Sequence, residues 1–66
     1  MKVKKSDVGR FCRVVYEDVG ADDGIIVNVN GDCVEYLSLR DHKLTDNNGA
    51  PIIALGNSVM ARNSGL

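Results

Sequence analysis

The stretch Ile25–Leu39 reads IIVNVNGDCVEYLSL, and it decides the fold because two β-rich runs flank an Asn-Gly pair. Asn30-Gly31 between such runs is the preferred centre of a type I′ turn, in which both central residues take positive φ. A two-residue turn at this place fixes the register, so Val27 is expected opposite Val34. The stretch therefore predicts a β-hairpin.

This register divides the expected hairpin into two faces, because successive side chains of a strand point to opposite sides. The face expected to be buried carries Ile25, Val27, Val29, Val34 and Tyr36. The opposite face carries Ile26, Asn28, Cys33, Glu35, Leu37 and Leu39.

Outside the hairpin, glycine, proline and Asn/Asp clusters cut the chain into pieces of strand length. Residues 8–17 alternate as a first strand, and residues 18–24 form a loop in which Gly20 and Gly24 can take positive φ. The later pieces are a ragged strand at 40–45, a turn at 46–49, an edge strand at 51–55, a turn at 56–57 and a last short segment at 58–62. Helix content is expected to be very low.

The length and composition of the chain limit its number of domains and its possible partners. It has 66 residues and a mass of 7.1 kDa, which predicts a single domain over residues 1–66 with fraying at 1–7 and 63–66. Its net charge of −1 gives no overall field to attract nucleic acid or an anionic membrane. No apolar run approaches 18 residues and no secretory pattern follows the first lysines, so we expect a cytoplasmic protein without membrane contact.

The strand pattern predicts an all-β fold of five or six short antiparallel strands, closed or half-closed as a small barrel. The run VGRFCRVVYE at 8–17, the run DGIIV at 23–27 and the run NGD at 30–32 resemble the opening of many SH3-like barrels, including small proteins of phages and mobile elements. The resemblance covers about residues 8–39 and rests on turn and strand chemistry common to that fold. It implies an architecture rather than one activity, because such barrels have many functions.

Catalytic and metal-binding chemistry find little support in this sequence. The two cysteines are expected to be free thiols in a reducing compartment, since small secreted scaffolds usually carry four or more. A zinc site from Cys12, Cys33 and His42 lacks paired ligand spacing and is one ligand short. Asp41 is poorly placed to orient His42, because neighbours in a strand point to opposite faces. We therefore expect no enzyme activity, no cofactor and no metal.

A second apolar face is the feature that suggests a function. One interior in so small a barrel does not hold both apolar faces of its strands. Such an exposed patch usually marks a protein partner or a homo-oligomer. Alternatively, strand bending and the C-terminal segment cover it. The candidate interface comprises Phe11, Val15, Ile26, Leu37 and Leu39.

A basic N-terminal region gives the second hypothesis, a nucleic-acid-binding barrel. Five basic residues stand against one acidic residue in 1–16, whereas 17–39 carries six acidic residues and no basic one. Aromatic residues for base stacking or for a polyproline groove are scarce, and the acidic loop lacks calcium-ligand spacing. The candidate nucleic-acid contacts are Lys2, Lys4, Lys5, Arg10 and Arg13.

Overall fold

A computed structural model describes residues 2–58 and confirms an all-β chain of antiparallel strands. A short 3₁₀ helix, η1 (Lys5–Asp7), forms within the segment that was expected to fray. The five strands are β1 (Arg10–Tyr16), β2 (Gly20–Asn30), β3 (Cys33–Ser38), β4 (Leu44–Asp46) and β5 (Ile52–Ser58). The expected fraying at 63–66 and most of the expected segment at 58–62 lie outside the described residues.

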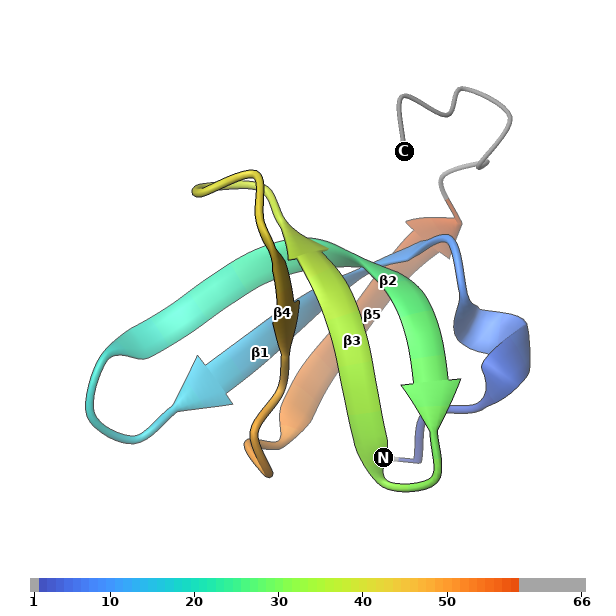
Figure 1. Ribbon diagram of the computed structural model, residues 1–66, viewed down its shortest axis with the longest axis horizontal. Coiled ribbons are helices and arrows are strands. Elements are labelled where there is room, and N and C mark those ends of the chain that lie inside the picture. Colours follow the sequence, from blue (N-terminus) through green and yellow to red (C-terminus); the bar gives the residue numbers. More distant parts are fainter. Residues whose placement is uncertain (1, 59–66) are drawn as a thin grey trace.

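The strands form one sheet in the order β4-β3-β2-β1-β5 (Figure 1). The first four strands follow one another as neighbours, and β5 then returns along the other side of β1. Strands β4 and β5 are the two edges, so the sheet curls but is open rather than closed.

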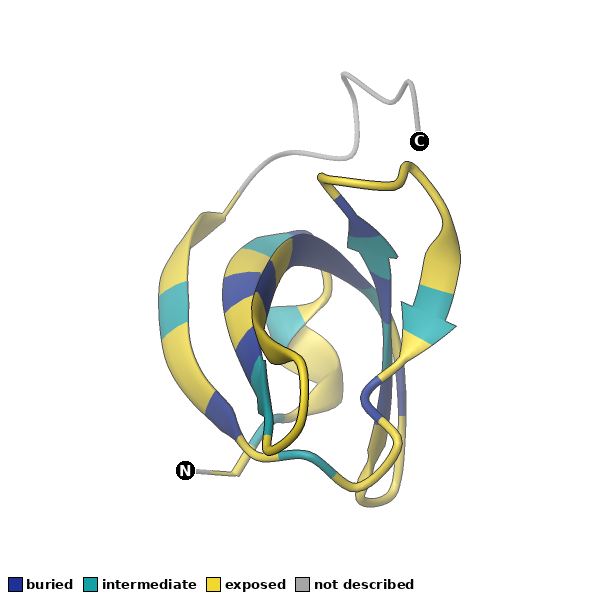
Figure 2. Ribbon diagram, turned by 90° about the vertical axis from the view of Figure 1, so that its left-hand side faces the viewer, coloured by how far each residue is buried: buried dark blue, intermediate teal, exposed yellow. Residues whose placement is uncertain are grey.

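Strand β2 produces the curl because its two halves pair with different neighbours. Residues 20–25 pair with β1, and residues 24–30 pair with β3. A register shift lies between Ile26 and Asn28, where Val27 is the extra residue. Such a bulge bends a strand and changes which residues face inward. Figure 2 shows a run of buried positions where the sheet curls, which corresponds to residues 24–26.

The expected register of the hairpin was wrong, by two positions on β3 near the turn and by one position beyond the bulge. Val29 lies opposite Val34, and Asn30 lies opposite Cys33, so the two turn residues are Gly31 and Asp32. Positive φ at Gly31 is confirmed, at +63°, whereas Asn30 does not share it. A glycine with positive φ at the first turn position only is typical of a type II′ turn rather than type I′.

The core lies on the concave side of the sheet. Its buried residues are Cys12, Val14, Ile26, Val29, Val34, Tyr36 and Ile52. Ile26, which was expected on the outer face, has only 1% of its surface exposed and lies opposite Tyr36. The reason is the bulge at Val27, because even-numbered residues of β2 point inward before it and Val29 points inward after it.

Candidate protein interface

The outer face of the sheet carries an apolar row that crosses four strands. Leu44 lies opposite Leu37, Leu37 opposite Ile25, and Ile25 opposite Phe11. Residues directly opposite each other in an antiparallel pair share a face. Because the neighbours of Leu37 in β3, Tyr36 and Ser38, are buried in the core, this face points away from it. We call Phe11, Ile25, Leu37 and Leu44 the outer row.

The outer row is open to solvent at both ends and sheltered in the middle. Phe11 is 41% exposed and Leu44 is 62% exposed, whereas Ile25 is 7% exposed. Leu39, also 41% exposed, lies with Phe11 along a shallow groove of about 320 Å³. Ala54 and Gly56 of β5 line the same groove, so the apolar surface reaches the far edge of the sheet.

The structure places the five residues of the predicted interface in different surroundings and corrects the position of one of them. Phe11, Leu37 and Leu39 are at least partly exposed, and the outer row or its groove contains all three. Val15 alternates with the buried Val14 and is half-buried on the outer face. Ile26 belongs to the core instead. The sequence prediction missed Ile25 and Leu44, because the wrong register placed Ile25 inside and 40–45 showed no clear alternation.

Charged residues flank the outer row on both sides. On one side, Arg13 Nε lies 2.8 Å from Asp23 Oδ1, and Arg13 Nη2 lies 3.2 Å from Asp23 Oδ2. This hydrogen bond to the guanidinium lowers the pKa of Asp23 and raises that of Arg13. On the other side, Glu35 of β3 lies opposite Asp46 of β4.

Two of the five predicted nucleic-acid contacts are engaged within the chain. Arg10 Nη1 lies 3.0 Å from Asp7 Oδ1, and its Nε donates to the Gly56 carbonyl oxygen at 2.9 Å. Arg13 is held by Asp23, as described above. Lys2, Lys4 and Lys5 remain exposed on the N-terminal segment. Nucleic-acid binding stays a prediction, with a smaller set of free cations than the sequence indicated.

A buried polar cluster links four strands at one end of the core. The Tyr36 hydroxyl donates to Asp22 Oδ2 at 3.0 Å and lies 2.8 Å from the Tyr16 hydroxyl. Ser38 Oγ donates to Asp22 Oδ1 at 3.3 Å, and Tyr16 donates to the Asp46 carbonyl oxygen at 3.1 Å. Burial and the bonds to Tyr16 and Asp22 raise the pKa of Tyr36 far above its ordinary value. These polar groups satisfy one another, which fits a structural role.

The two cysteines differ in their exposure to solvent. Burial, reinforced by the charges of Asp22 and Asp23, raises the pKa of the Cys12 thiol to about 11. Cys33 is exposed beside the hairpin turn, and both thiols are free. Within residues 2–58, no group of three or more His, Cys, Asp or Glu side chains could hold a metal ion.

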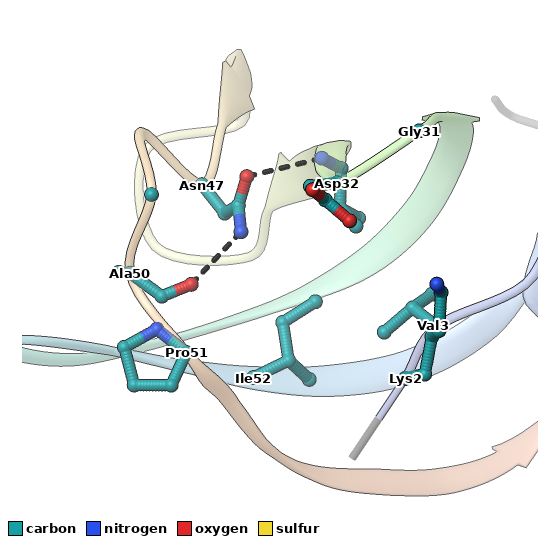
Figure 3. A pocket seen from close by; sticks show the side chains of 10 residues that line it. Lys2, Val3, Gly31, Asp32, Asn47, Ala50, Pro51 and Ile52 are labelled. Atoms are coloured by element: carbon teal, nitrogen blue, oxygen red, sulfur yellow. Dashed lines mark hydrogen bonds between the residues drawn. The ribbon is translucent and has the colours of Figure 1, made fainter.

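A second hollow lies between the N-terminal segment and the connection from β4 to β5 (Figure 3). Asn47 fixes that connection, because its Oδ1 accepts from the Val34 backbone N–H at 3.0 Å and its Nδ2 donates to the Ala50 carbonyl oxygen at 2.8 Å. Ile52 and Val3 also line this hollow. The side-chain amide of Asn47 is thus committed to the fold rather than to a ligand.

In the part of the chain that the structure describes, no helix is long and apolar enough to cross a membrane. Comparisons with protein-family models, with curated proteins and with solved structures give no significant match.

Proposed function

We propose that this chain is a small non-enzymatic interaction module of SH3-like architecture that self-associates through its outer face. The observation that carries the proposal is the outer row, four apolar residues in register across four strands on the side away from the core. Phe11 and Leu44 leave apolar surface exposed at the two ends of this row, and exposed apolar surface on a small protein usually marks a binding site. The two free cysteines fit the cytoplasmic location that we assign to the protein.

The strand order supports the SH3-like part of the proposal. Four strands follow one another as a meander, and the fifth returns to β1, so the sheet curls around a single core. This arrangement agrees with the resemblance seen over residues 8–39. Among residues 2–58, no further layer covers the sheet face that carries the outer row.

Self-association would remove apolar surface of the outer face from water. Burial of apolar surface contributes about 25 cal/mol per Å², so a few hundred Å² would contribute several kcal/mol. This is comparable to the whole stability expected of so small a domain. A second copy on the outer face would therefore matter to folding as well as to binding.

The test is sedimentation equilibrium at tens of micromolar protein, comparing the wild type with Leu37→Asp and Leu44→Asp. We expect the wild type to self-associate and both variants to shift toward monomer, because each places a charge in the outer row. Leu44 is the more exposed of the two, so its substitution carries the smaller risk to folding.

Ile53→Asp is the matched control, because Ile53 is 56% exposed but lies on the edge strand β5 outside the outer row. It should leave association unchanged. A wild type that sediments as a single 7.1 kDa species would contradict the proposal. Dissociation by Ile53→Asp alone would assign association to the β5 edge instead.

A further inference from the structure

Glu35 and Asp46 form a like-charged pair on the outer face. They lie directly opposite each other on β3 and β4, an arrangement that destabilises a sheet when both residues are ionised. Asp46 Oδ1 accepts a hydrogen bond from the Asn48 backbone N–H at 3.1 Å. None of the ion pairs among residues 2–58 includes either carboxylate. Among residues 2–58, two adjacent negative charges thus lie beside an apolar surface without an ion-pair partner.

The opposite side of the outer row, away from Glu35 and Asp46 along the strand direction, carries positive charge. Residues 39–43 connect β3 to β4 beyond Leu37 and Leu44, at the end away from Glu35 and Asp46. This connection contains Arg40 and Lys43, both exposed. The nearest approach of Arg40 to a carboxylate is 3.8 Å, to Asp41, and both side chains are more than half exposed. Lys43 takes part in none of the ion pairs among residues 2–58, and the Arg40 pair with Asp41 is long and exposed, so both cations can meet an external carboxylate.

We infer that the partner on the outer face is a second copy of this chain, related by a two-fold axis parallel to the outer row. This inference rests on the proposed self-association and specifies its geometry. A rotation of 180° about that axis places β4 of one copy over β4 of the other. It also reverses the direction of every strand relative to its counterpart. The acidic end of each copy then faces the basic connection of the other, and the outer rows face each other.

The charge pattern favours a second copy because it is self-complementary. A two-fold axis makes every contact twice, so one arrangement of charges satisfies both copies. Both carboxylates of the like-charged pair would gain a facing cation, which none of the ion pairs among residues 2–58 provides. Arg13 and Asp23 already neutralise each other and do not decide the orientation.

The test reverses the charges on one side of the outer row at a time. One variant is Glu35→Lys/Asp46→Lys, and the other is Arg40→Glu/Lys43→Glu. Each alone should weaken self-association about tenfold, because like charges then face each other across the interface. An equimolar mixture should associate at least as tightly as the wild type, because the two variants are complementary at both ends.

A second pair of variants controls for attraction between oppositely charged proteins. Glu17→Lys/Asp18→Lys and Lys4→Glu/Lys5→Glu carry the same changes in net charge at exposed positions outside the outer face. Mixing them should give no gain over the wild type. As an independent measurement without substitution, wild-type association should weaken as salt rises, because exposed ion pairs are screened.

The outcomes separate the geometry from the proposed function. Loss in each charge variant with recovery in the mixture supports the two-fold arrangement. Dissociation by Leu44→Asp with no effect of the exchanges or of salt overturns the arrangement and leaves self-association standing. A wild type that is monomeric throughout overturns both.

Discussion

Gly24 lies on the inner face of β2, where the ring of Tyr36 occupies the space that a side chain would need. A Cβ atom at this position would collide with Tyr36 Cδ2 and lie 2.6 Å from the Leu37 carbonyl oxygen. Its φ is not positive, so the expectation that Gly24 supplies a left-handed turn was wrong, whereas Gly20 does so at +90°. Position 24 therefore requires a glycine because no side-chain atom fits there. A glycine within a strand often marks such a close approach by neighbouring atoms.

We therefore expect Gly24→Ala to destabilise the protein by about 1–3 kcal/mol, as overpacking of a tight interior does. The measurement is the denaturant midpoint from urea unfolding followed by circular dichroism. Gly56→Ala is the control, because the nearest atom to its added Cβ is Phe11 Cβ at 3.1 Å rather than backbone oxygen. Equal losses in the two variants would contradict this account.

Cys12 gives the protein a pH dependence on the alkaline side. Its thiol has a pKa of about 11 in the folded chain against an ordinary value of 9.0. Because the folded pKa is the higher one, the folded state keeps the proton after the unfolded chain has lost it. The free energy of unfolding should hold below about pH 9 and fall between pH 9 and 11, at up to about 1.4 kcal/mol per pH unit.

Urea unfolding across this range measures the effect. Cys12→Ala removes the thiol and should flatten the decline, leaving the part due to Tyr36, whose pKa is also raised. Cys33→Ala is the matched control at an exposed thiol and should leave the slope unchanged. An unchanged slope in Cys12→Ala would assign the decline to other groups.

At the scale of the elements, strand β2 determines both the curl and the division of faces. Its bulge at Val27 changes the phase of alternation, so Ile26 and Val29 both point into the core. Val27 itself is half-buried. Truncation of a buried residue removes packed methyl groups and leaves a cavity, whereas a half-buried residue loses less.

We expect Val29→Ala to cost about 2 kcal/mol in free energy of unfolding and Val27→Ala less than about 1 kcal/mol. The same urea experiment compares the two variants, which remove identical atoms from one strand. A larger loss for Val27→Ala would mean that the expected register, with Val27 opposite Val34, describes the hairpin better than the bulged one.

The sequence predicted the existence of the hairpin, because β-branched runs around Asn30-Gly31 leave few other local structures. It did not predict the register, because a bulge is decided by contacts with strands far along the chain. Here Arg13 binds Asp23 on the outer face and Gly24 accommodates Tyr36 on the inner one. These two contacts fix which residues of β2 point inward.

The same limit applies to the candidate interface. Alternation within single strands was enough to place Phe11, Leu37 and Leu39 outside. Assigning Ile25 and Leu44 to the same surface required the pairing of β2 with β1 and of β3 with β4. The row is a property of the sheet rather than of any one strand.

At the scale of the whole molecule, the sheet has two edges and, among residues 2–58, one face without a covering layer. Strand β4 has only three residues, and β5 is bulged at two places against β1. Short and bulged edges resist pairing with another sheet. The outer face is therefore the better surface for self-association, and association there should stabilise the folded chain by mass action.

Thermal unfolding should show this stabilisation as a dependence on protein concentration. Between about 5 and about 500 µM, the Tm of the wild type should rise by several degrees, because only the folded chain associates. Differential scanning calorimetry at both concentrations provides the measurement. Leu44→Asp should have a Tm independent of concentration, and a constant Tm in the wild type would argue against a folded dimer.

The pairing of β5 with β1 also has a consequence for how fast the chain folds. The β1–β2 and β2–β3 hairpins join residues close in sequence, and hairpins of this kind form in about 1–10 µs. Joining Val14 to Ile52 instead closes a loop containing most of the domain, and the entropy of closing it opposes pairing before any contact is gained. We therefore expect the addition of β5 to be the slow step of folding, with a transition state in which β1, β2 and β3 are paired and one side of β1 is still unpaired.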